Sequence, residues 1–200
     1  ACAMLPRRRD AGRGRKGMGN ERSIAVFGSS EPREGERSYE EARRVGALLA
    51  RSGYGVVTGG YGGVMEAASR GAVESGGTAV GVVSRIFPGR APNRFLTDTV
   101  ETADLHDRTR QLVARADGYV VLPGKSGTLA ELFSLLALHR AGCLGVRPVV
   151  LVGGAFRPLL RHLAQEGMLE PERFDVARVV DTPEEAIETI ESFLAGVREV

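Results

Sequence analysis

Three glycine-rich segments of this 200-residue chain have the composition of turns that bind phosphate. They are Gly28-Ser29-Ser30, Gly59-Gly60-Tyr61-Gly62-Gly63 and Pro123-Gly124-Lys125-Ser126-Gly127-Thr128. Glycine lets a phosphate approach the backbone, and the N–H groups that begin a following helix attract negative charge. One such turn is most often only a tight connection, whereas three at equivalent strand ends favour a crevice that binds a phosphorylated ligand.

The nucleotide-binding motifs of fixed spacing do not match these turns. The dinucleotide fingerprint G-x-G-x-x-G requires a third glycine where Met65 follows Gly60 and Gly62, and no acidic residue ends the preceding predicted strand to bind a ribose. NAD is therefore disfavoured. The P-loop pattern G-x-x-x-x-G-K-[ST] requires glycine at Tyr119, inside a predicted strand. A P-loop is disfavoured as well.

Alternating strands and helices are predicted to place the turns at one edge of a parallel sheet. Apolar runs predict strands at 24–28, 55–58, 79–83, 118–122 and 148–152, and helical periodicity predicts helices near 38–52, 64–74, 105–116, 128–141, 156–167 and 182–195. The polar segment 85–99 is expected to be a loop over the sheet edge. Five or six strands, each followed by a helix, favour an α/β fold: a doubly wound (Rossmann-like) parallel sheet flanked by helices, in a single domain.

Capping boxes mark three of the predicted helix starts. They run from Ser38 to Glu41, from Thr128 to Glu131 and from Thr182 to Glu185. In each, the hydroxyl is expected to accept a hydrogen bond from a backbone N–H of the first turn.

The third glycine turn belongs to a longer stretch that resembles a known family. Pro123-Gly124-Lys125-Ser126-Gly127-Thr128-Leu129-Ala130-Glu131 resembles the P-G-G-x-G-T-x-x-E motif of the LONELY GUY (LOG) family, often labelled lysine decarboxylases. Gly59-Gly60 with Gly63-Val64-Met65 resembles the family's G-G-x-x-G-x-M turn, and Leu105-His106-Asp107-Arg108 resembles its M-x-x-R-K segment. The resemblance covers about residues 23 to 195.

The resemblance implies a Rossmann-like fold, usually a homodimer, and one main activity. That activity is hydrolysis of the N-glycosidic bond of adenine-type nucleoside 5′-monophosphates, including cytokinin ribotides, to free base and ribose 5-phosphate. Relatives of similar sequence bind the molybdenum cofactor. A non-catalytic carrier or sensor that binds a nucleotide or the molybdenum cofactor in the same crevice is therefore the alternative function.

The same resemblance implies the site residues. Arg108 and Glu131 are expected to be catalytic. The residues expected to bind the nucleotide phosphate are Gly28, Ser29, Gly59, Gly60, Gly62, Gly63, Met65, Gly124, Lys125, Ser126, Gly127 and Thr128. Hydrolysis of this kind requires no redox cofactor and no metal, and neither is expected. The three histidines, at 106, 139 and 162, lack the spacing of metal ligands.

The residues themselves leave two roles open for each catalytic candidate. Arg108 lies at helical spacing from Leu105 and Leu112, so it projects from an apolar helix face. It either forms an internal ion pair or snorkels to water, or it reaches the crevice to hold phosphate or assist the departing base. Glu131 either completes a capping box or supplies a carboxylate that stabilises charge on the sugar or activates water. Tyr61 could stack on a base or merely cover the crevice.

Three positions depart from the family pattern. Lys125 and Ala130 replace its second glycine and first glutamate, and Thr109 replaces its lysine. Because lysine reaches φ > 0 less easily than glycine, Lys125 is expected to reshape the turn, and its ammonium could add phosphate affinity or obstruct the site. These departures favour binding over turnover. The decarboxylase label has little support, because Lys16 and Lys125 are the only lysines and neither has a convincing Schiff-base setting.

Charge divides the chain into a basic leader, residues 1–22, and a domain, residues 23–200. The leader holds seven basic and two acidic side chains, although the net charge of the whole chain is only +2. We expect a disordered tail, or a true start at Met18, and the alternative is a short arm that binds nucleic acid. Two cysteines, Cys2 and Cys143, are too few for a disulfide framework or a cysteine zinc site. No apolar run reaches 18 residues and no signal peptide opens the chain, so a cytoplasmic protein without membrane contact is expected.

Overall fold

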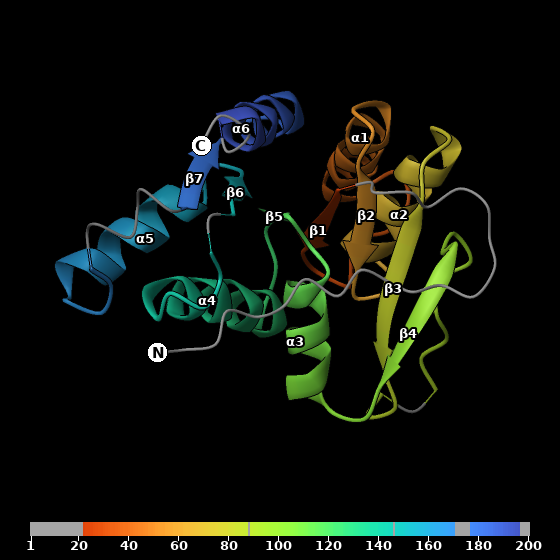
Figure 1. Ribbon diagram of the computed structural model, residues 1–200, viewed down its shortest axis with the longest axis horizontal. Coiled ribbons are helices and arrows are strands. Elements are labelled where there is room, and N and C mark those ends of the chain that lie inside the picture. Colours follow the sequence, from red (N-terminus) through yellow and green to blue (C-terminus); the bar gives the residue numbers. More distant parts are fainter. Residues whose placement is uncertain (1–21, 88, 146, 171–176, 197–200) are drawn as a thin grey trace.

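The computed structural model describes residues 22–87, 89–145, 147–170 and 177–196. These residues form one sheet of seven strands, which lies between two layers of helices (Figure 1). The sheet order is β4-β3-β2-β1-β5-β6-β7. The strands are β1 (Ser23–Phe27), β2 (Gly55–Thr58), β3 (Ala79–Ser84), β4 (Asp98–Thr102), β5 (Gly118–Val121), β6 (Val149–Val152) and β7 (Ala177–Val180). All neighbouring strands are parallel.

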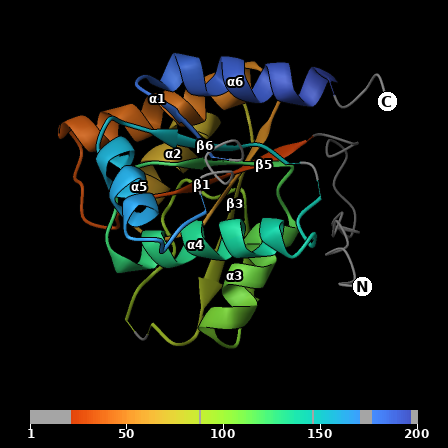
Figure 2. The ribbon, with the colours of Figure 1, turned by 90° about the vertical axis from the view of Figure 1, so that its left-hand side faces the viewer.

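Alternate side chains of the central strands enter two separate cores. Ile24 and Val26 of β1 pack under the helices α1 and α6 and beside α2, whereas Ala25 and Phe27 face the core formed with α3, α4 and α5. Figure 2 shows α1 and α6 on one side of the sheet and α3 and α4 on the other. The helices are α1 (Arg37–Arg51), α2 (Val64–Glu74), α3 (Leu105–Ala114), α4 (Ser126–Arg140), α5 (Phe156–Gln165) and α6 (Pro183–Gly196). The predicted doubly wound α/β domain is therefore confirmed.

The direction in which the sheet grows reverses between β1 and β5. From β1 the chain adds β2, β3 and β4 on one side, and it then returns to add β5, β6 and β7 on the other. In open parallel sheets this reversal leaves a crevice at the carboxyl ends of the two central strands, and ligands bind there. The turns that follow β1 and β5 lie at this point, and the turn after β2 lies next to them.

Two edge strands escaped prediction. The segment 85–99 was expected to be a loop, but β4 begins at Asp98 within it and pairs with β3. The strand β7 was not predicted at all. Both strands lie at an edge of the sheet: one of the five residues of β4 and two of the four of β7 are buried. Neither carries the continuous buried apolar run by which the inner strands are recognised.

Two of the three predicted capping boxes are not formed, because their helices begin earlier than expected. Helix α1 begins at Arg37, so Ser38 lies inside its first turn, and the N-cap residue Glu36 makes no side-chain cap. Helix α4 begins at Ser126, which likewise places Thr128 inside the helix. At α6 the prediction is confirmed, since the Thr182 hydroxyl accepts a hydrogen bond of 3.2 Å from the Glu185 backbone N–H.

Most of the basic leader, residues 1–21, lies outside the described residues. Its last residue, Arg22, is described, and its Nη1 donates a hydrogen bond of 3.0 Å to the Leu194 carbonyl of α6. Among the described helices, none combines the length and apolar character needed to cross a membrane.

Candidate active site

The three glycine turns meet above the carboxyl ends of β1, β2 and β5 and line a pocket of about 160 Å³. The turns bond directly to one another: the Ser29 N–H donates to the Pro123 carbonyl at 3.3 Å, and the Val64 N–H donates to the Ser29 carbonyl at 2.8 Å. The walls include the predicted residues Gly28, Ser29, Gly59, Met65, Arg108, Lys125, Gly127, Thr128 and Glu131. The other predicted residues, Gly60, Gly62, Gly63, Gly124 and Ser126, do not line this pocket.

Close packing explains several of these glycines without a ligand. A Cβ at Gly124 would lie 2.2 Å from the Thr128 hydroxyl oxygen, and one at Gly63 would lie 2.4 Å from the Ser29 carbonyl oxygen. At Gly127 a Cβ would meet nothing within 4 Å. Gly63 lets its turn approach the turn of Ser29, and Gly124 makes room both for Thr128 of its own turn and for the Ser29 backbone nitrogen, which a Cβ would approach to 2.9 Å. Gly127 leaves open space at the first turn of α4, beside the pocket.

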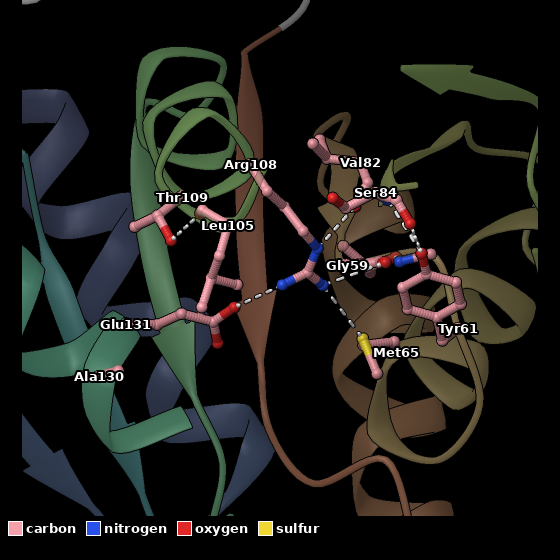
Figure 3. A network of polar contacts seen from close by, with 12 residues as sticks. Gly59, Tyr61, Met65, Val82, Ser84, Leu105, Arg108, Thr109, Ala130 and Glu131 are labelled. Atoms are coloured by element: carbon pink, nitrogen blue, oxygen red, sulfur yellow. Dashed lines mark hydrogen bonds and ion pairs between the residues drawn. The ribbon is translucent and has the colours of Figure 1, made fainter. Parts of the chain in front are cut away.

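Arg108 lines the pocket and is almost fully buried, with 7% of its surface exposed. Its Nε donates to the Val82 carbonyl at 3.0 Å, its Nη2 to the Gly59 carbonyl at 3.1 Å, and its Nη1 to Glu131 Oε1 at 3.4 Å (Figure 3). Nη2 also lies 3.9 Å from Met65 Sδ. Arg108 does form an internal ion pair, as one of the two sequence interpretations held, and this pair also faces the pocket.

The close approach of Arg108 requires glycine at position 59. A Cβ there would lie 1.8 Å from Nη2 of Arg108 and 2.6 Å from Sδ of Met65. The first glycine of this turn therefore makes room for the guanidinium, a role that its sequence motif does not reveal.

Glu131 turns toward Arg108 and does not cap α4. Its side chain is 13% exposed, and the side chain of Arg108 is 8% exposed. Burial raises the pKa of Glu131 to about 7, although the Arg108 charge and hydrogen bond pull it down. A carboxyl group with this pKa exists in both its protonated and charged forms near neutral pH, as a general acid or base must.

The pocket wall opposite α4 is aromatic. The Tyr61 hydroxyl donates to the Ser84 carbonyl at 3.0 Å and accepts from the Ser84 N–H at 2.9 Å, which fixes the ring as a buried wall. Phe87 meets that ring edge-on, with centroids 5.6 Å apart, and the guanidinium carbon of Arg90 lies 5.6 Å from the centre of the Phe87 ring. Phe87 and Arg90 line the pocket, and sequence reasoning missed both, because no spaced motif marks them.

The three departures from the family pattern have simple structural consequences. Lys125 adopts φ −93°, so the turn needs no left-handed residue here, and the expected reshaping for that reason does not arise. Its Nζ lies 2.7 Å from Oε1 of Glu31, another pocket residue that the sequence did not indicate. Thr109 donates to the Leu105 carbonyl of its own helix at 3.0 Å, and Ala130 is exposed on α4. The pair of Arg108 and Glu131 is thus formed without a side chain from positions 109 or 130 (Figure 3).

No group of three or more metal-binding side chains gathers within the described ranges. The polar side chains that line the pocket include the guanidinium groups of Arg90 and Arg108, the carboxyl groups of Glu31 and Glu131, the Lys125 ammonium and the hydroxyl groups of Ser29, Ser30 and Thr128. This set suits an anionic organic ligand and acid–base chemistry.

Comparisons with known proteins show what the whole chain is similar to. The model of a family described as "possible lysine decarboxylase" matches residues 65–190. A cytokinin riboside 5′-monophosphate phosphoribohydrolase of Rhodococcoides fascians is 34% identical over 75% of this chain and 79% of its own. A protein of the same name from Mycobacterium tuberculosis is 31% identical over 82% of this chain and 91% of its own. Among solved structures, a molybdenum cofactor binding protein of Rippkaea orientalis superposes with a TM-score of 0.70 at 22% identity, covering 88% of this chain and 98% of its own, which shows a shared fold.

Proposed function

Because the chain belongs to the family described as possible lysine decarboxylases, the LOG family, we propose that it is a nucleoside 5′-monophosphate phosphoribohydrolase. Its substrates would be AMP or N6-substituted AMPs of the cytokinin type, and its products the free base and ribose 5-phosphate. The observation that carries the proposal is the buried Arg108–Glu131 pair, 3.4 Å apart in the wall of a pocket built from three glycine turns.

The proposed chemistry assigns one step to each member of the pair. The C1′–N bond of the nucleotide breaks, its electrons leave with the base, and positive charge builds on the ribose. The Glu131 carboxylate stabilises that charge and takes a proton from the water that attacks C1′. That proton is then returned to the departing base, which leaves as the neutral free base, and Glu131 is again ionised. The Arg108 guanidinium, held in place by two backbone carbonyls, offsets the negative charge of the departing base.

The 5′-phosphate would bind at the first turn of α4. Gly127 leaves open space there, and the buried Thr128 lines the same pocket. Backbone N–H groups of a helix N-terminus stabilise an anion by charge and by hydrogen bonding. In this proposal Lys125 exchanges Glu31 for the phosphate, since an exposed ion pair of this kind contributes little to stability and exchanges readily.

Decarboxylation fits the site less well. A decarboxylase of the pyridoxal type needs a lysine that forms a Schiff base in an enclosed pocket. Lys125 is the single lysine of the described residues, and it is mostly exposed and paired with Glu31 at the pocket rim. Lys16 lies outside the described residues.

The test is base release from AMP and a panel of N6-substituted AMPs, followed by chromatography. Wild type should release free base, and Glu131→Gln should abolish release while AMP still binds. Glu101→Gln is the matched control, because Glu101 pairs with Arg85 at 3.2 Å on the surface, away from the pocket. Release that persists in Glu131→Gln would remove Glu131 from the mechanism.

A second candidate function is a carrier or sensor that binds a nucleotide or the molybdenum cofactor without turnover. The three departures from the family pattern favour it. Ala130 and Thr109 stand where that pattern has a glutamate and a lysine next in sequence to the catalytic pair, and Lys125 stands where it has a glycine. Saturable binding of AMP without any release of base would support this function over hydrolysis.

The proposal includes a homodimer and a cytoplasmic location. Helix α4 carries apolar residues around its circumference, and such helices are normally buried on all sides. Phe133 on α4 is nevertheless 37% exposed, and Leu105 on the neighbouring helix α3 is 47% exposed. A second copy that covers these two helices would bury both side chains. Light scattering after gel filtration should give twice the monomer mass for wild type and a lower mass for Phe133→Glu.

A further inference from the structure

Two pocket residues, Phe87 and Arg90, have no role in the proposed hydrolysis. Both follow β3, on the opposite side of the pocket from the α4 turn that would bind phosphate. On the proposed function, the place of these two residues is beside the part of the ligand that lies beyond the bond to be cleaved.

Arg108 lies close both to Glu131 and to Phe87. Its Nη1 lies 3.4 Å from Glu131 on α4, and its guanidinium carbon lies 6.0 Å from the centre of the Phe87 ring. Phe87 follows β3 and Thr128 follows β5, and the strands β2 and β1 lie between these two in the sheet, so the two residues line opposite sides of the pocket. If phosphate lies at Thr128 and the reacting carbon at Glu131, the base extends toward Phe87.

The ring of Phe87 is suited to stack on a flat heterocycle. Tyr61 holds it edge-on, with an interplanar angle of 86°, and Phe87 is only partly buried. The exposed Arg90 places its planar guanidinium over this ring at 5.6 Å. Aromatic faces attract both cations and stacked bases. A flat nitrogen heterocycle can therefore stack on Phe87 in place of the Arg90 guanidinium.

We propose that Phe87 and Arg90 form the base-binding subsite of this pocket. The ligand's flat nitrogen heterocycle stacks on Phe87, and Arg90 donates hydrogen bonds to acceptor atoms at the edge of that heterocycle. The chemical class is a phosphorylated compound with a flat, acceptor-bearing ring system, a description that purine nucleoside 5′-monophosphates and pterin phosphates share. The experiment therefore tests a purine ligand and a pterin ligand separately.

The experiment measures by calorimetry how AMP, ribose 5-phosphate and neopterin monophosphate bind to wild type, Phe87→Leu, Phe87→Tyr and Arg90→Met. Leucine keeps apolar volume but removes the aromatic face, whereas tyrosine keeps the face. We expect AMP affinity to fall by at least about fivefold in Phe87→Leu and to be retained in Phe87→Tyr, from the usual strength of base–aromatic stacking. Arg90→Met should also weaken AMP binding, and ribose 5-phosphate should bind all four proteins alike.

The chain supplies a matched control pair. Arg94 lies over Phe95 at 4.9 Å in the same segment, and neither residue lines the pocket. Phe95→Leu and Arg94→Met should leave AMP affinity unchanged. A Phe87→Leu protein with wild-type AMP affinity, or with AMP and ribose 5-phosphate weakened alike, would overturn the subsite.

The two arms separate this inference from the proposed function. AMP that binds wild type and Phe87→Leu equally contradicts the subsite alone. Neopterin monophosphate that binds where AMP does not, and is weakened in Phe87→Leu, supports the subsite and overturns hydrolysis of nucleotides. A wild-type protein that binds neither compound overturns both.

Discussion

Replacing Glu131 by glutamine should abolish base release and at the same time stabilise the protein at alkaline pH. The carboxyl group has a pKa of about 7 in the fold, against an ordinary value of 4.5, because its burial outweighs its attraction to Arg108. Between these values the folded protein holds a proton that the unfolded chain has lost. The free energy of unfolding therefore falls as the pH rises from 4.5 to above 7, and the total loss corresponds to about 3 kcal/mol.

The assay is urea denaturation of wild type and Glu131→Gln from pH 5 to pH 9. Glutamine cannot ionise, so the advantage of the variant over wild type should grow with pH, by about 2.5 kcal/mol across this interval. Glu101→Gln removes an exposed, surface-paired carboxylate and should show no comparable trend. A difference between Glu131→Gln and wild type that stays constant with pH, or that shrinks as the pH rises, would refute the argument from burial.

Three further predictions address the same pocket. If Glu131 acts as the base, kcat/KM for AMP should rise with pH and level off above about 7, the pKa of that group, and a profile that falls over this range would exclude the charged form as the active one. Gly59→Ala should displace the Arg108 guanidinium, because the added Cβ would lie 1.8 Å from Nη2. Steady-state kinetics should show a loss of base release at least as large as that of Arg108→Lys, and near-normal kinetics would contradict this prediction. Lys125→Gly should change the free energy of unfolding by less than about 1 kcal/mol, because the ion pair of Lys125 with Glu31 is exposed. The same substitution should raise KM for AMP and leave kcat unchanged, and an unchanged KM would remove Lys125 from the phosphate site.

Inner strands and helices could be predicted from the sequence because burial leaves a strong apolar signal. The strands β1, β2, β3, β5 and β6 are buried along almost their whole length. The edge strands β4 and β7 are paired on one side only, and their exposed residues can be polar without cost. These two strands form through backbone hydrogen bonds to β3 and β6, and the pattern of side chains in the sequence does not predict such bonds.

Site residues divide in a similar way. Arg108 and Glu131 were indicated by motif, whereas Phe87, Arg90 and Glu31 reach the pocket from loops without a spaced pattern. Their positions depend on how the loops after β1 and β3 fold over the sheet edge. The interleaved phenylalanines and arginines of segment 85–95 are a compositional signal of aromatic and cationic contacts, but they do not separate the pocket pair from the Arg94–Phe95 pair outside it.

The two sequence interpretations of Arg108, ion pair or site residue, describe one arrangement. A buried ion pair contributes little net stability, because desolvation of both charges offsets their attraction. Here the raised pKa of Glu131 indicates that desolvation outweighs the attraction to Arg108, so the ionised carboxylate costs the fold free energy above neutral pH. A carboxyl group with a pKa near 7 can exchange a proton with water, as the proposed hydrolysis requires of Glu131. The stability and activity of Glu131→Gln therefore bear on the same question, and opposite changes in the two would favour hydrolysis over carriage.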